Sequence, residues 1–365
     1  MRFEAPHERE AEKRAWLVVR DAYRLREPLP APRRRLRPAV ALAVAAAVVA
    51  CVVSPPGRAV LGSLRRAVGV EPAAPALFRL PTAGKLLVRS DEGAWIVHAD
   101  GSKRLLPGWR DAAWSPFGRY VAVAGPDELA AVDLDGHVRW SLARPAVRLP
   151  DWGGTRTDTR IAYLTRSRLH VVAGDGRSDG DPGGRPAAAR VAPAWQPRRF
   201  LLAYVTTRGR VKAYNAVAGT VAWQSDTHFP RPSRLEWSSD GRLLLVVTHG
   251  KASVVRDGRV VAVRSGRVTA AAFRPGSHTL AAVRRHGGTS EVLVGPRVVF
   301  RGTGVFEDIS WSPDGKWLLV TWPTADQWVF VRVAGGRRIR AVANVTRQFE
   351  GGAFPKIAGW CCSAG

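Results

Sequence analysis

The residue types that most often carry chemistry are thinly spread along this chain. No two histidines have the spacing of a His-x-x-x-His metal site, and no Gly-x-Ser-x-Gly elbow, phosphate-binding loop or dinucleotide fingerprint appears. The eight histidines are His7, His98, His137, His170, His228, His249, His278 and His286. We therefore predict no catalytic residue, no cofactor and no metal site. For His98, His137 and His170 we expect structural hydrogen bonds to the backbone.

Three carboxylates gather in a glycine-rich stretch near the middle of the chain. Asp175, Asp179 and Asp181 offer the hard oxygen ligands that Ca²⁺ requires. The stretch lacks further ligands, and the nearby Arg177 and Arg185 would repel a cation. A long polar loop explains the cluster more simply, although the calcium interpretation stays open here.

The three cysteines do not form a recognisable framework. Cys51 lies in an apolar run, whereas Cys361 and Cys362 are adjacent near the C-terminus. Neighbouring cysteines rarely reach good disulfide geometry, and three residues make neither a disulfide scaffold nor a zinc site. We therefore expect cysteine chemistry not to be the function.

The net charge is strongly positive, at +26. A functional interpretation is attraction to nucleic acid, anionic lipid or an acidic wall polymer. A compositional interpretation is a GC-rich genome, because 49 of the 56 basic residues are arginine and they are scattered along the whole chain. No nucleic-acid-binding motif accompanies the charge, so nucleic acid is not an expected partner. At 46% hydrophobic and 24% charged, the chain has a globular rather than a disordered composition.

One segment predicts a membrane anchor. Residues 38–57 carry no charge, the apolar heart is residues 39–53, and Pro55-Pro56 ends the helix. We predict a transmembrane helix over residues 38–54 that contacts the lipid bilayer, near the minimum length for spanning. The alternative is a buried helix of a soluble protein.

The flanks of this segment predict its orientation. Seven arginines lie within about twenty residues on its N-terminal side, against three on the other side, so residues 1–37 are expected in the cytoplasm. Residues 55–80 resemble an amphipathic helix followed by a linker, and residues 81–365 would lie outside a bacterial cell membrane crossed once. Residues 48–51 also resemble a lipobox, which would instead lipidate Cys51.

A repeat of about forty residues organises the C-terminal four fifths of the chain. The segment Trp-Ser-Pro-Asp-Gly-Lys at residues 311–316 recurs as Trp-Ser-Ser-Asp-Gly-Arg at 237–242 and as Trp-Ser-Pro-Phe-Gly-Arg at 114–119. Weaker copies complete a series whose members are 38, 43, 42, 36, 38 and 49 residues apart. The repeat aromatics are Trp114, Trp152, Trp195, Trp237, Phe273, Trp311 and Trp360.

Each repeat predicts a small four-stranded antiparallel sheet. An apolar run of strand length follows the aromatic, and a glycine-containing turn such as Asp135-Gly136 or Asp257-Gly258 comes 21 to 25 residues after it. Such sheets are too small to bury their own faces, so they must stack radially, with the aromatics between neighbours. We predict an all-β fold, a β-propeller of about seven blades, in which Trp360 and residues 84–106 complete one blade from both chain ends. A β-sandwich is the alternative.

This signature resembles the WD-repeat-like propeller repeat of the bacterial TolB protein and its surface-exposed relatives. The resemblance covers residues 81–365 and implies a propeller fold but no particular ligand. Trp140 and Trp223 are similar to the docking tryptophans of quinoprotein-like propellers, yet two copies do not imply a quinone cofactor.

Three functions are consistent with this organisation. The leading hypothesis is a membrane-anchored extracytoplasmic module that binds or scaffolds a protein, glycan or envelope polymer, and not an enzyme. The second is a transmembrane signalling protein that resembles an anti-sigma regulator and reports inward through residues 1–37. The third is an extracytoplasmic hydrolase whose site would assemble from distant blades.

Overall fold

The computed structural model describes residues 70–74, 79–182, 188–336 and 338–362. The chain divides into two compact units, residues 1–53 and 54–365, and the whole first unit lies outside the described residues. The predicted cytoplasmic segment, the predicted transmembrane helix over 38–54 and Cys51 therefore lie outside them too. Among the described residues, no helix is long and apolar enough to cross a membrane.

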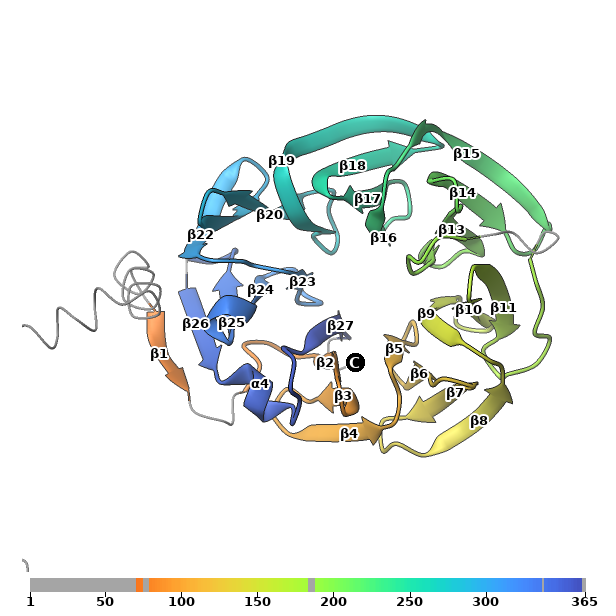
Figure 1. The fold of residues 1–365 in the computed structure, drawn as a ribbon, viewed down its shortest axis with the longest axis horizontal. Helices are drawn as coiled ribbons and strands as arrows, with labels where there is room; N and C mark the ends of the chain where they lie inside the picture. The colour runs from red at the N-terminus through yellow and green to blue at the C-terminus, as the bar shows by residue number, and fades with distance from the viewer. Residues whose placement is uncertain (1–69, 75–78, 183–187, 337, 363–365) are drawn as a thin grey trace, which may run out of the picture. The chain divides into compact units, whose positions relative to one another are not determined.

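The described strands form a ring of seven blades, which confirms the predicted all-β propeller (Figure 1). Within each blade the strands run antiparallel, from an inner strand beside the ring axis to an outer strand at the rim. Blade 1 holds β27 (Lys356–Cys361), β2 (Lys85–Ser90), β3 (Gly93–Val97) and β4 (Lys103–Pro107). Blade 2 holds β5 (Asp111–Trp114), β6 (Tyr120–Ala124), β7 (Glu128–Asp133) and β8 (Val138–Ala143). Blade 3 holds β9 (Val147–Gly154), β10 (Thr159–Thr165) and β11 (Arg168–Ala173).

The second half of the ring repeats this pattern, with one strand shared between two blades. Blade 4 holds β12 (Ala194–Trp195), β13 (Leu201–Val205), β14 (Arg210–Asn215) and β15 (Thr220–His228). Blade 5 holds β16 (Pro232–Trp237), β17 (Leu244–Thr248), β18 (Gly250–Arg256) and the first half of β19 (Arg259–Phe273). Blade 6 holds the second half of β19, β20 (Leu280–His286), β21 (Thr289–Val294) and β22 (Arg297–Thr303).

Blade 7 lies beside the point where the ring closes. It holds β23 (Ile309–Trp311), β24 (Trp317–Trp322), β25 (Gln327–Arg332) and β26 (Arg338–Ala343), and β1 (Val70–Ala74) joins its outer edge in parallel. The short helices η1 (Pro323–Ala325) and α4 (Val345–Gln348) lie in its connections. β1 is a strand within residues 55–80, where an amphipathic helix followed by a linker is predicted.

The two ends of the propeller sequence meet in blade 1. The C-terminal strand β27 pairs antiparallel with β2, with Trp360 opposite Leu86 and Ile357 opposite Val88. This is the closure that the unfinished repeat at Trp360 predicts. Because β27 comes from the far end of the chain, backbone hydrogen bonds hold the ring shut.

Blade 3 departs from the predicted four strands. Its sheet has three strands in the described part of the chain, and only an isolated bridge between Val171 and Gly180 continues it outward. The sequence that follows β11 is rich in glycine and aspartate, which favour turns over a ladder. Residues 174–182 therefore occupy the place of the outer strand without forming one.

The repeat motif builds the turn between the first and second strand of a blade. In the copy at 311–316, Ser312 Oγ accepts a hydrogen bond from Trp317 N–H at 2.9 Å, and Gly315 N–H donates to Ser312 O at 2.8 Å. Gly315 has a φ of +63°, a left-handed conformation that favours glycine. The same serine and glycine contacts recur at residues 237–242 and 114–119.

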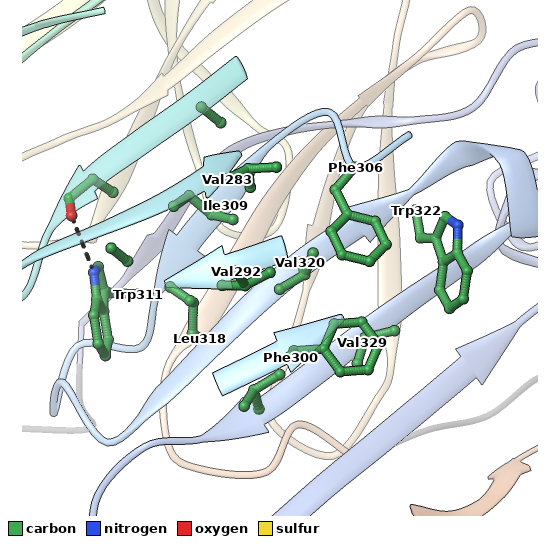
Figure 2. Close-up of a cluster of buried hydrophobic side chains, with 14 of the residues drawn as sticks. Val283, Val292, Phe300, Phe306, Ile309, Trp311, Leu318, Val320, Trp322 and Val329 are labelled. Atoms are coloured by element: carbon green, nitrogen blue, oxygen red, sulfur yellow. Dashed lines mark hydrogen bonds between the residues drawn. The ribbon is translucent and has the colours of Figure 1, made fainter. Parts of the chain in front are cut away.

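The core lies between blades rather than inside one domain centre. Figure 2 shows the cluster between blades 6 and 7, in which Phe306 stacks on Phe300 with ring centroids 5.4 Å apart. β17 is buried along its whole length, as an apolar strand with both faces covered should be. Each blade therefore depends on both neighbours for burial, and the complete ring is the stable unit.

Candidate binding face and central channel

A channel runs along the ring axis and is lined by the inner strand of every blade. It encloses about 640 Å³, and its wall carries charged groups of both signs. The charged lining residues are Arg89, Asp111, Asp151, Arg234, Glu236, Glu307, Asp308 and Lys356. If the channel held an active site, titratable groups should converge on this wall.

Arg234 is the centre of the largest charged network in the channel. Its guanidinium lies 2.9 Å from Glu236 Oε2 and 3.0 Å from Asp308 Oδ1, and so links blade 5 to blade 7 across the channel. Burial lowers the pKa of Arg234, but the two carboxylates together outweigh it and the net shift is upward. Burial raises the pKa of Glu236 and of Asp308 although Arg234 opposes it. Arg234 is thus shared by two acids, one more than it can neutralise, and its contacts tie blade 5 to blade 7.

Two channel carboxylates fasten neighbouring blades by accepting backbone hydrogen bonds. Asp151 Oδ2 accepts the N–H of Trp195 at 2.8 Å, and Glu236 Oε1 accepts the N–H of Phe273 at 2.8 Å. In both cases an acid directly before one repeat aromatic receives the amide of the next repeat aromatic. This link was not predicted from the sequence, although an acid directly precedes the repeat aromatic in Asp151-Trp152 and Glu236-Trp237.

Asp151 makes the stability of the ring depend on pH. Burial raises the pKa of its carboxyl to about 6, against the hydrogen bond from Trp195. An aspartate in an unfolded chain has a pKa of about 3.9. The folded state therefore binds this proton more tightly, and the stability contribution is complete below about pH 4 and is lost as the pH rises through about 6.

Asp151→Asn should remove this pH dependence while keeping an oxygen for the Trp195 amide. Relative to the wild type, we expect the free energy of unfolding of the variant to rise by up to about 2 kcal/mol between about pH 4 and pH 7, a value discounted for water in the channel. The urea midpoint of both proteins is measured by tryptophan fluorescence at several pH values across that range. Parallel curves for the two proteins would show that Asp151 titrates normally.

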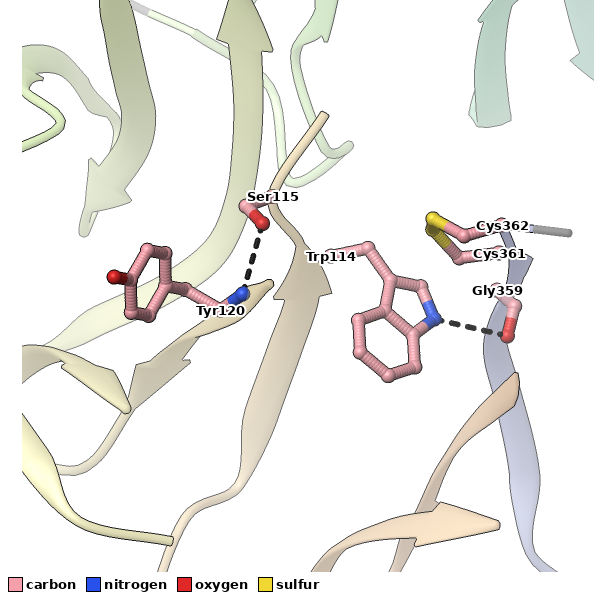
Figure 3. Close-up of a disulfide and its surroundings, with 6 residues drawn as sticks. All are labelled: Trp114, Ser115, Tyr120, Gly359, Cys361 and Cys362. Atoms are coloured by element: carbon pink, nitrogen blue, oxygen red, sulfur yellow. Dashed lines mark hydrogen bonds between the residues drawn. A yellow bond between two sulfur atoms is a disulfide. The ribbon is translucent and has the colours of Figure 1, made fainter. Parts of the chain in front are cut away.

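The predicted repeat aromatics lie at the inner strands, and three of their indoles bridge neighbouring blades. Trp237 Nε1 donates to Ala194 O at 3.0 Å, Trp311 Nε1 to Ala272 O at 3.3 Å (Figure 2), and Trp114 Nε1 to Gly359 O at 3.4 Å (Figure 3). Each acceptor is the backbone carbonyl of the residue directly before the repeat aromatic of the neighbouring blade. The remaining four, Trp152, Trp195, Phe273 and Trp360, are buried in the clusters between blades. The series thus joins neighbouring blades around the ring.

Trp140 and Trp223 lie on outer strands and dock on the next blade. Trp140 Nε1 donates to Gly174 O at 2.9 Å, and its ring packs against Gly176 of the Asp175-Gly176 turn. Trp223 similarly approaches Gly258 of the Asp257-Gly258 turn. Both therefore support the rim of the propeller.

The carboxylates considered for calcium are engaged separately. Asp179 accepts hydrogen bonds from Arg144 Nε at 2.8 Å and from Tyr163 Oη at 2.6 Å, and Asp175 is exposed. Asp181 lies 2.7 Å from His170 Nδ1, and His170 Nε2 lies 2.7 Å from Thr165 Oγ1. Hydroxyl, imidazole and carboxylate are connected in the order of a hydrolase triad. Because the acids come from the segment that replaces the fourth strand, the network fastens that segment to blade 3.

The prediction that these histidine side chains bond the backbone is wrong for His137 and His170, whose rings lie beside the carboxylates of Asp133 and Asp181. His137 lies 3.3 Å from Asp133 in the turn between β7 and β8, and Asp135 is close enough for the three to surround an ion. Asp133 already accepts the N–H groups of Asp135 and His137, which accounts for the cluster as a turn. His98 donates its backbone N–H to Ser102 O at 2.9 Å.

The strongest positive feature is a basic groove where blades 2, 3 and 4 meet. Four arginines line a cavity of about 780 Å³: Arg110, Arg148, Arg166 and Arg190. They come from the start of β5, from β9, from the turn between β10 and β11, and from the connection to β12. Sequence reasoning missed this groove, because its arginines are far apart in a chain rich in arginine.

The charges in the groove are not neutralised by the protein. None of these four arginines forms an ion pair within the part of the chain that the structure describes, and Arg148 Nη2 is buried there without a hydrogen-bond partner. Burial lowers the pKa of Arg148, and the positive charge of Arg190 lowers it further, while Asp111 opposes both. Asp111 is itself paired with Arg89, which leaves the exposed Asp127 as the other acid of the groove. Such an arrangement favours an anionic ligand.

The two adjacent cysteines contradict the sequence expectation. Cys361 ends β27, and its sulfur is bonded to that of Cys362 (Figure 3). Cys362 takes a left-handed backbone conformation, with a φ of 55°, which turns it back toward its neighbour. The expectation that these cysteines do not pair was therefore wrong.

These features define a seven-bladed propeller with a channel lined by charges of both signs and a basic groove lined by four arginines. No protein-family model matches the sequence, and no curated protein matches it. Solved structures do match. A chain in the crystal structure of the Mitotic Checkpoint Complex has a TM-score of 0.52 and 13% identity, over 74% of this chain and 85% of that chain.

A second similar structure is Hsv2 of Kluyveromyces lactis, with a TM-score of 0.53 and 12% identity, over 71% of this chain and 93% of that chain. A variant of the same protein with loop 6CD replaced by a Gly-Ser linker has a TM-score of 0.51 and 12% identity. The fold of this chain is thus that of a WD40-like β-propeller. At these identities the likeness concerns the fold alone.

Proposed function

We propose that this chain is a membrane-anchored, TolB-type propeller that binds a partner protein through an acidic segment placed in the basic groove. The observation that carries the proposal is the set of four arginines without carboxylate partners around a cavity of about 780 Å³. Guanidinium groups bind carboxylates in a bidentate manner, and a segment rich in glutamate or aspartate would neutralise several of them at once. The apolar neighbours Pro126, Pro145 and Val147 would contact the backbone of such a segment.

The proposed location is the outer side of a bacterial cell membrane, with residues 38–54 as the anchor. The excess of arginine before this segment supports an inward N-terminus. The scaffold is consistent with binding rather than catalysis, because the channel acids Asp151, Glu236 and Asp308 are engaged in contacts that join one blade to another.

The test uses the full chain in detergent micelles and a fluorescein-labelled hexaglutamate peptide. We expect binding that weakens with salt, and a loss of about tenfold or more in affinity for Arg148→Glu combined with Arg190→Glu. The matched control is Arg119→Glu combined with Arg242→Glu, which makes the same charge change at exposed positions in the motif turns at the other end of the blades. Equal losses in both variants would show that only net charge matters and would overturn the groove as the site.

Two further arms separate the competing functions. The labelled peptide is displaced either by unlabelled hexaglutamate or by an acidic wall polymer. Displacement by the polymer at a much lower concentration would favour an envelope polymer over a protein as the natural partner. Cross-linking from native membranes, with the full chain and with a version lacking residues 2–34, tests the signalling alternative. Loss of a cytoplasmic regulator with the shortened chain would favour the anti-sigma-like function over a plain binding module.

A further inference from the structure

The bond between Cys361 and Cys362 contributes little to holding the ring together. The chain entropy removed by a disulfide grows with the length of the loop that it closes, and adjacent residues close the shortest loop. The bond also joins no second strand to β27. Closure rests instead on the pairing of β27 with β2 and on Trp360, which is 8% exposed. Its reactivity, rather than its contribution to stability, is therefore the property that needs an explanation.

The surroundings of the two sulfurs are shaped to accept them. They lie against Gly118, the glycine of the motif turn in blade 2, and a Cβ there would meet Cys361 Sγ at 3.0 Å and Cys362 Sγ more closely still. Trp114, from the same turn, donates its indole N–H to Gly359 O two residues before the pair (Figure 3). The pair thus sits at the contact between the closing strand of blade 1 and the motif turn of blade 2.

Two properties suit the pair to exchange chemistry. Cys361 and Cys362 are both half-buried, so solvent reagents reach them at the end of the strand. The positive φ of Cys362 also turns this residue back toward Cys361, so the backbone places the two sulfurs where the bond can re-form after reduction.

We propose that Cys361 and Cys362 form a reversible dithiol–disulfide redox site, reduced by dithiols and reoxidised by disulfides. A thiolate of the reductant attacks one sulfur, the bond between the cysteines breaks, and the other cysteine leaves as a thiolate that takes a proton. The second thiol of the reductant then displaces the first cysteine, which is also protonated. Two electrons and two protons have passed to the cysteines, and the reductant has become a disulfide.

The direct test cycles the full chain in detergent micelles between dithiothreitol and oxidised glutathione under native conditions. Free thiols are trapped with N-ethylmaleimide after denaturation, and mass spectrometry reads the tryptic peptide that begins at Ile357 and carries both cysteines. We expect this peptide unlabelled as purified, doubly labelled after dithiothreitol, and unlabelled again after reoxidation. Labelling of both cysteines in every state, or resistance to dithiothreitol until the protein is denatured, would overturn the proposal.

A matched pair of glycine variants tests whether the contact with blade 2 tunes the site. Gly118 and Gly276 occupy equivalent motif turns with φ of +62° and +71°, but a Cβ at Gly276 meets nothing within 4 Å. Alanine therefore strains both backbones alike and crowds the sulfurs only at Gly118. We expect Gly118→Ala to shift the equilibrium toward the dithiol by about tenfold and Gly276→Ala to leave it unchanged. Equal shifts would show that backbone strain, and not contact with the sulfurs, is responsible.

Discussion

Replacing Arg234 by methionine should destabilise the propeller by about 1–3 kcal/mol at neutral pH, because two channel carboxylates lose their shared cation and channel solvent screens part of the loss. Glu236 and Asp308 are both held beside Arg234, at 2.9 and 3.0 Å, and burial already raises the pKa of each. Without the guanidinium these pKa values should rise further. The expected readout is a lower urea midpoint in tryptophan fluorescence, with an unchanged slope.

The pH dependence of this loss follows from the sign of the shifts. Carboxyl groups whose pKa is raised in the folded state cost stability once the pH exceeds that pKa. The penalty of Arg234→Met should therefore shrink as the pH falls, since the two acids then become neutral. Adding Glu236→Gln and Asp308→Asn to the variant should restore much of the stability at neutral pH.

A surface arginine provides the control for this prediction. Arg242 also pairs with a carboxylate, that of Asp240 at 3.7 Å, but its side chain is 79% exposed. Exposed pairs contribute little, so Arg242→Met should change the midpoint far less. If both variants lost the same stability, or if the loss at Arg234 did not vary with pH, the channel network would not be the cause.

The sequence predicts the ring because its signal is local and repeated. A motif turn is encoded by a few adjacent residues: an aromatic that fills the space between blades and, in the clearest copies, a serine and a glycine at positive φ. Blade 3 shows the limit of the pattern. Its first aromatic and its Asp175-Gly176 turn follow the repeat, but turn-forming residues replace the outer strand, and their tertiary contacts through Asp179 and Asp181 are not visible in a periodicity.

The basic groove could not be predicted in the same way. Arg110, Arg148, Arg166 and Arg190 come from separate loops, and nothing local distinguishes them from the other arginines of the chain. What sets them apart is that they line one cavity together and that Arg148 Nη2 is buried there without a hydrogen-bond partner, which is a property of three-dimensional packing. The cysteine pair was misjudged for a related reason. General disulfide geometry argues against adjacent partners, and the left-handed Cys362 beside Gly118 is a tertiary arrangement.

Replacing Trp360 by alanine should have the other large effect, a loss of about 3–5 kcal/mol together with opening of the ring. Trp360 is 8% exposed and lies in the cluster between blades 7 and 1, edge-on to Phe330 with ring centroids 5.7 Å apart. Because β27 is held to β2 by only one short ladder, weakening its packing should release the strand. Lys356 is already exposed, but its backbone is held in β27, so release of the strand should let trypsin remove the C-terminal peptide before it cuts the other blades.

Trp195→Ala is the matched control, because it separates loss of burial from loss of closure. Trp195 is 6% exposed and belongs to the same repeat series, but it packs between blades 3 and 4, where the chain is continuous. We expect a similar fall in the urea midpoint and no early release of the C-terminal peptide. Identical trypsin patterns for the two variants would mean that β27 is no weaker than any other inner strand. The ring would then be held by the sum of its contacts between blades and not by its closing strand.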